Sequence, residues 1–392
     1  MDPALVALFV GAALASLFMA WVIGAGSSGA TPFAPAVGAN AVSTMRAAFV
    51  VGLFGFAGAV TQGGSVSEAV GSGLVGGANL PVAGVILVLL LGAGLMAVGI
   101  QTGYPIATAF TVTGAVIGVG LALGGTPVWP KYRQIAAVWT LTPFVGGGIA
   151  FAIASLLPRP GVPERYSVPV LAGLVGAVLV NVEFSFLGAG ASSGSVRSVG
   201  QQALPVGGLA AAAAVTGVAA LAIGAAVWWD VRRDERGGLR RVLLALGSLV
   251  AFSAGGSQVG LAVGPLLPLL DEVGGLSAFA VLVGGGLGML VGSWTGAPRM
   301  IKSLAQDYSS LGPRRSISAL VPSFLIAQLA VLLGVPVSFN EIVVSAIIGS
   351  GAAVGGRAAV DARKLVVTVG AWAGSFALSF ALAYVAAALL LS

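Results

Sequence analysis

One apolar stretch of this chain, residues 103–118, recurs in register as residues 334–349, and both copies begin with Gly-x-Pro. The copies also share a valine, an alanine, an isoleucine and a glycine at equivalent later positions. Proline lacks a backbone N–H and glycine is flexible, so each Gly-x-Pro interrupts a helix. In lipid, an interrupted backbone survives only where protein or a water-filled cavity satisfies its polar groups. The duplication therefore predicts two matching interrupted helices.

Composition places these interruptions inside a membrane. Hydrophobic residues make up 58% of the chain and charged residues only 8%, and several apolar runs reach the roughly 20 residues that a spanning helix needs. We predict an all-α polytopic membrane protein with about twelve transmembrane segments. They are expected near residues 4–23, 36–61, 80–101, 104–123, 135–157, 167–187, 204–229, 242–268, 276–293, 317–334, 336–356 and 366–391.

The basic residues predict the orientation of the chain. The loop at 230–241 contains five arginines, and basic loops face the cytoplasm. Counting crossings from it places both termini and the loop at 269–275, with Asp271 and Glu272, on the outer side. The helix leading into the first Gly-x-Pro then runs inward and the helix leading into the second runs outward. This is the inverted-topology repeat of many secondary transporters, in which paired breaks mark the substrate site.

The repeats divide the chain into three parts. They are an N-terminal transmembrane repeat (1–157), connecting transmembrane helices with the basic cytoplasmic loop (158–241), and a C-terminal transmembrane repeat (242–392). A second pair of glycine-rich stretches, at 24–38 and 252–266, precedes the Gly-x-Pro copies. Each half therefore reads as a break, two helices, a Gly-x-Pro break and a further helix. We expect broken helices or re-entrant hairpins that meet at the midplane.

Specific residues in these motifs match a known family. The second glycine-rich stretch reads Phe-Ser-x-Gly, followed by Val, Ala and Gly-Pro-Leu, and residues 139–143 read Trp-Thr-Leu-Thr-Pro. On these features, which extend over about residues 15–390, the chain is identified as a divergent prokaryotic member of the inorganic phosphate transporter (PiT) family. That family carries a Gly-Ala-Asn-Asp motif and a Gly-x-Pro-Val-Ser-Thr-Thr-His motif in each half. The resemblance implies phosphate transport by alternating access with a coupling cation.

The chain departs from the family at the positions expected to bind the cation and the anion. Ser27-Ser28 and Ser257-Gln258 replace the two Asn-Asp pairs. The two Ser-Thr-Thr-His tetrads become Ala-Thr-Ala-Phe at 107–110 and Ser-Phe-Asn-Glu at 338–341. The scaffold motifs are kept, whereas the residues that would carry the chemistry are changed.

We predict an anion site at the helix breaks, because free N–H groups at helix N-termini favour negative charge and hydroxyls add donors. Serine and threonine stand at equivalent places in the two halves. The alternative for any single hydroxyl is a bond to its own i−4 carbonyl or to a neighbouring helix. The predicted substrate-binding residues are Ser27, Thr31, Thr108, Ser257, Ser338 and Asn340.

The predicted contacts of the coupling cation are Ser28, Gln258 and Glu341. Without the family's aspartates, Na⁺ keeps oxygen ligands but loses charge compensation. A carboxylate inside an apolar segment is costly and suggests a function. Glu341 would accept the phosphate proton, relay a coupling proton or bind a cation; the alternative is that it reaches water or pairs with a loop arginine. Glu183 lies near a segment end, where an interfacial position is the simpler interpretation.

The substrate remains open between two oxyanions. Monohydrogen phosphate carries a proton that needs an acceptor, whereas sulfate is satisfied by donors alone. The family resemblance favours phosphate, and the neutral serines and Gln258 favour a sulfate permease on the same scaffold. A protein of another class, a degenerate membrane protein that transports nothing, would also explain the lost acids.

The remaining expectations concern partners and location. The chain has no cysteine, no histidine and no phosphate loop, so we expect no enzyme. We expect no metal site and no cofactor beyond Na⁺ as a coupling ion. The expected partners are phosphate or sulfate, Na⁺ or H⁺, the lipid bilayer and a second copy in a homodimer, but no nucleic acid. The expected location is the plasma membrane of a prokaryote, with many spans.

Overall fold

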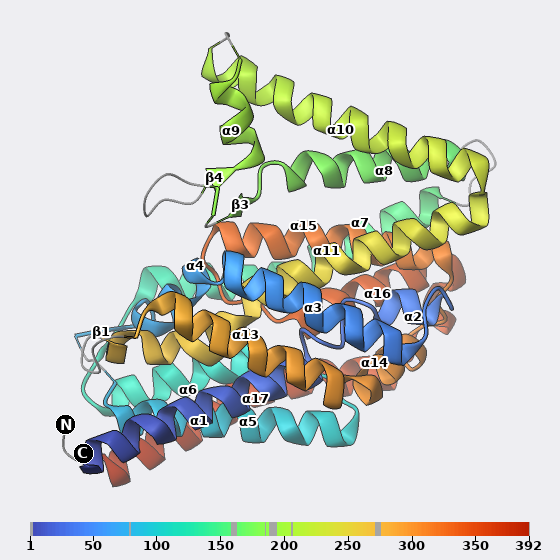
Figure 1. Cartoon of the computed structure of the whole chain (residues 1–392). Helices are drawn as coiled ribbons and strands as arrows, with labels where there is room; N and C mark the ends of the chain where they lie inside the picture. Colours follow the sequence, from blue (N-terminus) through green and yellow to red (C-terminus); the bar gives the residue numbers. More distant parts are fainter. Residues whose placement is uncertain are drawn as a thin grey trace.

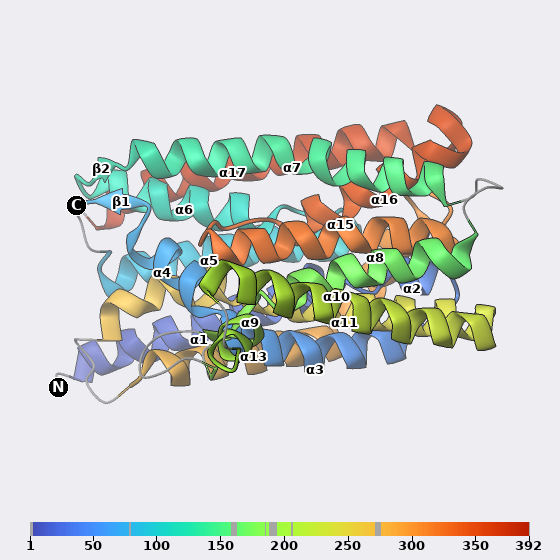
Figure 2. The ribbon, with the colours of Figure 1, turned by 90° about the horizontal axis from the view of Figure 1, so that it is seen from above.

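The computed structural model describes residues 3–77, 80–157, 163–184, 186–187, 194–204, 207–270 and 276–391. It is an all-α membrane protein whose long helices lie roughly side by side (Figures 1 and 2). Among the described residues, nine helices are long and apolar enough to span a membrane, and two shorter apolar helices accompany them. The part of the predicted outer loop that carries Asp271 and Glu272 lies outside the described residues.

The first half contains seven helices and two short strands. They are α1 (Pro3–Gly26), α2 (Ala34–Gly38), α3 (Thr44–Gln62), α4 (Gly64–Ser72), β1 (Val75–Gly76), α5 (Val82–Thr102), α6 (Thr108–Ala122), β2 (Thr126–Pro127) and α7 (Trp129–Leu156). β1 and β2 pair antiparallel. A connecting unit follows. It contains α8 (Glu164–Leu179), β3 (Glu183–Phe184), β4 (Gly194–Ser195), α9 (Val196–Gln202) and α10 (Gly208–Arg233), and its strands also pair antiparallel.

The second half repeats the helix order of the first. It contains α11 (Glu235–Val263), η1 (Gly264–Leu269), α13 (Ala278–Thr295), α14 (Ala297–Gln306), α15 (Pro313–Leu332), α16 (Phe339–Gly355), η2 (Gly356–Ala359) and α17 (Ala362–Leu390). All twelve predicted apolar segments contain a helix. The short helices α2, α4, α9 and α14 and the two-residue strands are additions that hydropathy does not predict.

Helices of one half pack on helices of the other half, and their counterparts make the reciprocal contacts. α1 packs on α13 while its counterpart α11 packs on α3, and α6 packs on α17 while α16 packs on α7. In Figure 2, α1 runs from left to right and α11 from right to left. Both termini lie at one end of the molecule, opposite the turn between α10 and α11. This exchange with reversed direction is the arrangement that the sequence predicts for inverted repeats.

One predicted break is wrong in position. The first glycine-rich stretch does interrupt the chain, since α1 ends at Gly26 and a series of turns follows. The second does not, because α11 continues to Val263 and changes to a 3₁₀-helix only at Gly264. Its glycines serve packing instead: a Cβ on Gly255 would lie 1.8 Å from the carbonyl oxygen of Gly55 in α3. Close approach of two helices in lipid depends on such small residues.

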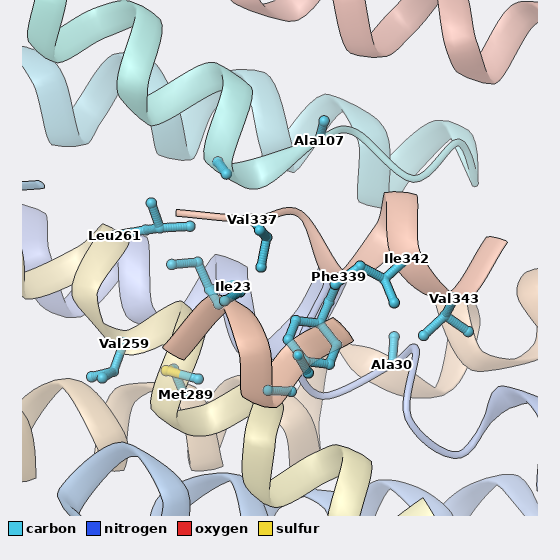
Figure 3. Packing of buried hydrophobic residues seen from close by; sticks show 14 of the residues in the cluster. Ile23, Ala30, Ala107, Val259, Leu261, Met289, Val337, Phe339, Ile342 and Val343 are labelled. Atoms are coloured by element: carbon cyan, nitrogen blue, oxygen red, sulfur yellow. The ribbon is translucent and has the colours of Figure 1, made fainter. Parts of the chain in front are cut away.

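The connecting unit stands apart from this symmetric body. In Figure 1, α8, α9 and α10 form a layer above the rest of the molecule. α10 packs on α8 and α11, yet most of its residues are exposed. The buried apolar core lies in the two repeats, where side chains of α1, α11 and α16 such as Ile23, Leu261 and Phe339 pack together (Figure 3).

Candidate substrate site

Two glycine loops bring helix N-termini into the interior of the protein. Gly103 and Gly334 have positive φ angles of 76° and 55°, a conformation that strongly favours glycine. After each glycine the chain runs extended through the proline, and α6 begins at Thr108 and α16 at Phe339. Both starting residues are fully buried. The two Gly-x-Pro motifs thus produce helix starts inside the molecule, as predicted.

Each proline carbonyl is held by a tryptophan from the helix that packs alongside. Trp372 Nε1 of α17 donates to the carbonyl of Pro105 at 2.8 Å. Trp139 Nε1 of α7 donates to the carbonyl of Pro336 at 2.8 Å. The resemblance singles out Trp139 alone, but the structure gives it a counterpart with the same role in the other half.

Two amide side chains connect the four segments that carry the predicted site. Asn340 Nδ2 donates to the carbonyl of Gly26 at 3.2 Å and to that of Ile106 at 2.7 Å. Gln258 Nε2 donates to the carbonyl of Val337 at 2.6 Å. The end of α1, the start of α6, the C-terminal part of α11 and the start of α16 therefore meet, which is the convergence that the two motif pairs predict.

Among the predicted site residues, all of which the structure describes, four buried polar atoms on α6, α11 and α16 have no hydrogen-bond partner. They are Thr108 Oγ1, Ser257 Oγ, Asn340 Oδ1 and Glu341 Oε2. Their residues are buried, with at most 2% of the surface of each exposed. Buried polar groups are nearly always paired, so each exception needs an explanation. Three of the four, on Thr108, Asn340 and Glu341, lie in the first turns of α6 and α16, which makes these helix starts the candidate site for a polar ligand.

The other candidate hydroxyls bond within the protein. Ser27 Oγ donates to Gln258 Oε1 at 3.2 Å. Thr31 Oγ1 donates to its i−4 carbonyl at 3.1 Å, and Ser28 Oγ to the carbonyl of Ile23 at 3.4 Å. Ser338 Oγ accepts the N–H of Glu341 at 3.4 Å and so caps α16. Local bonding thus accounts for Thr31 and Ser28 in this conformation, whereas Ser27 is joined to the other half.

The candidate site contains few charged side chains and is buried in the protein. Glu341 is the one carboxylate among the nine predicted residues, and it lies in the first turn of α16, where the helix dipole favours negative charge. The surroundings are apolar, and Figure 3 shows Ala107, Val337 and Phe339 among the buried side chains there. Glu183, by contrast, is exposed on β3.

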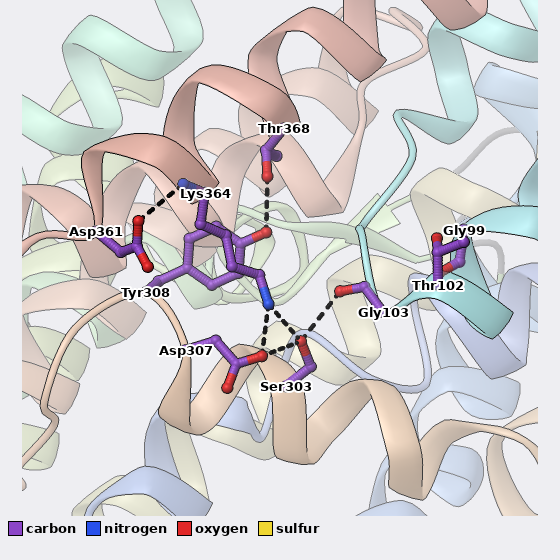
Figure 4. Close-up of polar contacts among 9 residues, drawn as sticks. All are labelled: Gly99, Thr102, Gly103, Ser303, Asp307, Tyr308, Asp361, Lys364 and Thr368. Carbon is purple, nitrogen blue, oxygen red and sulfur yellow. Dashed lines mark hydrogen bonds and ion pairs between the residues drawn. The ribbon is translucent and has the colours of Figure 1, made fainter.

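Two lysines at the loops were missed by the motif analysis. Lys364 and Lys131 are the third residues of α17 and α7, and each precedes its tryptophan by eight positions. Lys364 pairs with Asp307 and donates to Ser303 Oγ at 3.1 Å (Figure 4). Lys131 donates to the carbonyl of Gly334 at 2.9 Å. The repeated Lys-x₇-Trp spacing is the signal that could have identified both.

Comparison with known proteins places these features in context. The sequence profile described as the phosphate transporter family matches residues 23–383. A candidate phosphate permease of Chlamydia pneumoniae is 27% identical over 88% of this chain and 89% of its own. One of Pyrococcus abyssi is also 27% identical, over 91% of each chain.

Two further comparisons extend the match. Inorganic phosphate transporter 2-1 of the chloroplast of Arabidopsis thaliana is 24% identical over 92% of this chain and 68% of its own. A solved structure titled the sodium-dependent phosphate transporter superposes with a TM-score of 0.79 at 21% identity, covering 98% of both chains. The overall fold is therefore that of a known transporter.

Proposed function

The chain belongs to the phosphate transporter family, and we propose that it carries inorganic phosphate across a membrane as a secondary transporter coupled to Na⁺ or H⁺. One observation supports this most directly: two buried hydroxyls are unpartnered, those of Thr108 at the start of α6 and of Ser257, which precedes Gln258 on α11. Free amides and hydroxyls at helix starts are suited to an oxyanion. The names of the relatives support phosphate as that oxyanion.

Glu341 favours phosphate over sulfate. At neutral pH, inorganic phosphate still carries a proton, which a carboxylate can accept in a hydrogen bond. Glu341 Oε2 is buried, unpartnered and in the first turn of α16. Sulfate has no proton to offer and would face this carboxylate with repulsion alone. The neutral Ser27-Ser28 and Ser257-Gln258 pairs are the observation that keeps sulfate as the second candidate.

The repeats support alternating access. Equivalent helices run in opposite directions and each half contributes one glycine loop and one interior helix start. Such pseudo-symmetry lets two states exchange the roles of the halves, so that the central site opens to one side and then to the other. We propose a location in the plasma membrane with both termini outside, as the basic turn between α10 and α11 requires.

The test is uptake of labelled phosphate and labelled sulfate into proteoliposomes, under a sodium gradient, a proton gradient and neither. We expect saturable phosphate uptake that one gradient increases, and this identifies the coupling ion. Replacing Thr108 and Ser338 together by alanine is expected to lower uptake at least about tenfold, because hydrogen bonds to a charged ligand are lost.

The matched control is Ser248→Ala with Ser318→Ala, since both hydroxyls only bond their own i−4 carbonyls. Its uptake should remain close to that of the unmodified protein. Sulfate uptake without phosphate uptake would transfer the assignment to the second candidate. No uptake of either anion, with no stabilisation by either, would favour a protein that transports nothing.

A further inference from the structure

A cavity of about 490 Å³ lies away from the central site, where the connecting unit, the α3–α4 region of the first repeat and α15 of the second repeat meet. Its polar lining comes from four elements or the turns beside them. These residues are Thr61, Gln62, Ser65, Asn181, Glu183 and Gln328. Ser65 Oγ donates to the carbonyl of Val331 at 2.9 Å, close to Gly334. The cavity therefore adjoins the second glycine loop.

A chain of hydrogen bonds leads from this cavity into the protein. Gln328 Nε2 lies 3.4 Å from Gln62 Oε1 and donates to Ser253 Oγ at 2.6 Å. Gln62 and Gln328 are 7% and 6% exposed, whereas Ser253 is fully buried. The Gln328 amide thus stands between the open cavity and the interior.

The chain of polar groups continues to the central site. Ser253 lies one helical turn before Ser257 on α11, so the two hydroxyls share a face of the helix. Ser257 Oγ is one of the unpartnered atoms of the candidate site. Polar side chains therefore follow one another from the cavity to Ser257, with one helical turn of α11 between the last two.

The inner two members of this series, Ser253 and Gln328, have no polar counterpart in the first repeat. Counting from the matched serines and glycines of the two repeats, Ile23 occupies the place of Ser253 and Ala97 that of Gln328. Both counterparts are apolar: Ile23 is buried and Ala97 is small. Repeat symmetry alone does not explain two polar side chains that interrupt an apolar interior, so a use at this end of the molecule is indicated.

The connecting unit covers the cavity. Gln62 Nε2 donates to the carbonyl of Glu183 at 2.9 Å, and the Phe184 ring lies 5.8 Å from that of Phe252, next to Ser253. The segment that contains β3 is therefore fixed over the polar series by two contacts. The connecting unit, which has no counterpart in either repeat, helps to form the cavity.

We propose that this cavity is the vestibule through which the anion reaches the central site from the Gly334 side, and that Gln328 is the plug between them. The inference rests on the proposed function. Apart from Glu183, the polar groups of the cavity are amides and hydroxyls, which offer donors to a passing anion without holding it as a fixed positive charge would. Moving one side chain, Gln328, would join the vestibule to Ser253 and Ser257.

The chain has no cysteine, so single cysteines can be introduced without removing others. Ser65→Cys reports the vestibule, Ser253→Cys reports the path behind the plug, and Ser379→Cys is the buried control. The Ser379 hydroxyl bonds only its i−3 carbonyl, between α17 and α6. Each variant is reconstituted in sealed vesicles and exposed to a membrane-impermeant thiol reagent from either side.

We expect Ser253→Cys to react from the same side as Ser65→Cys, and about tenfold faster when Gln328→Ala removes the plug and its hydrogen bond. The rates of Ser65→Cys and Ser379→Cys should not change with Gln328→Ala. If that variant does not fold, Gln328→Asn, which shortens the same amide, replaces it. Inorganic phosphate should slow the labelling of Ser253→Cys.

Several results would overturn the proposal. One is that Ser253→Cys reacts no faster than Ser379→Cys, or reacts only from the side opposite to Ser65→Cys. Another is that the labelling rates of all three cysteines rise together in Gln328→Ala. Labelling in the expected pattern without protection by phosphate would support the path while contradicting phosphate as the substrate. Failure of the path and failure of the proposed function therefore give different results.

Discussion

The two glycine loops are built alike but closed differently. At the first loop, Lys364 pairs with Asp307 beside the Tyr308 ring (Figure 4). Its Nζ lies 5.1 Å from the ring centre of Tyr308 and 5.3 Å from that of Tyr104. There the carbonyl of Gly103 accepts from Ser303 Oγ at 3.0 Å. The lysine therefore sits in a network of charge, hydroxyl and aromatic contacts.

At the second loop the equivalent lysine makes a single hydrogen bond to the described residues. Lys131 donates to the carbonyl of Gly334. Within the described part of the chain, no carboxylate pairs with it. The end with the richer network has several contacts to break before it can open, whereas the end beside the cavity has few. The shared scaffold therefore fixes where the two loops lie, and the local side chains determine how firmly each loop is held.

The largest effect is expected where the two halves agree. Trp139→Phe and Trp372→Phe each remove a hydrogen bond to a proline carbonyl and part of a packed ring. Each change should lower the free energy of unfolding by about 2 to 3 kcal/mol, through a lost bond, an unsatisfied carbonyl and lost packing. Denaturation of the purified variants in detergent measures the loss.

If the scaffold is symmetric, these two losses should agree within about 1 kcal/mol, since mutational effects vary with local packing by about that much. A conservative control is Trp228→Phe on α10, a helix with mostly exposed residues, which should change stability little. A large loss of stability for one tryptophan variant and none for the other would show that the two tryptophans are not equivalent.

The next effect should separate the two ends. Lys364→Ala removes an ion pair, a hydrogen bond and two cation–π contacts, and should lower stability by about 2 kcal/mol. Lys131→Ala removes one hydrogen bond to a carbonyl and should cost about 1 kcal/mol. Hydrogen exchange at residues 103–107 and 333–338 then reports which loop each change loosens.

Each substitution should raise exchange mainly at its own loop. Lys302→Ala, which removes only a longer-range charge interaction with Asp307, is the control. Equal losses for the two lysines, or faster exchange at both loops from either change, would show that the ends are closed alike.

The sequence predicts the scaffold because its signals are local. Hydropathy predicts twelve apolar segments and each contains a helix, although only nine of the described helices are long and apolar enough to span a membrane. Each Gly-x-Pro fixes a helix start through the backbone alone. The convergence of the four motif segments could also be predicted, since repeats place equivalent breaks face to face. The candidate site follows from this to the level of the segments, as the contacts of Asn340 and Gln258 illustrate.

The misses have a different physical origin. A glycine in a membrane helix either breaks it or lets another helix approach, and only the partner decides. Gly255 lies against Gly55, so α11 stays intact where a break is predicted. Likewise, Gln62 and Gln328 are unremarkable in sequence, because their link to Ser253 depends on three helices packed together. Tertiary contacts of this kind leave no periodic pattern.

The smallest effect concerns the acid that distinguishes the first loop. Burial raises the pKa of Asp307, but hydrogen bonds from Lys364 and Ser303 outweigh it and hold that pKa below its ordinary value. A carboxylate with a depressed pKa contributes stability above its unfolded pKa, near 4, and loses it as the pH falls through the folded pKa. The Asp307 side chain is 44% exposed, so solvent screening keeps the contribution below about 0.5 kcal/mol.

Asp307→Asn should therefore lower the melting temperature slightly at pH 7, and its difference from the unmodified protein should shrink as the pH falls below about 4. A pH series of melting temperatures in detergent measures this, with Lys364→Ala as the reference background. Without Lys364 only the contributions of Ser303 and Lys302 still lower the pKa of Asp307, so the pH-dependent effect of Asp307→Asn should be smaller there. A difference that persists or grows in acid would show that the carboxylate does not strengthen this end, and that the aromatic rings around Lys364 account for the asymmetry between the loops.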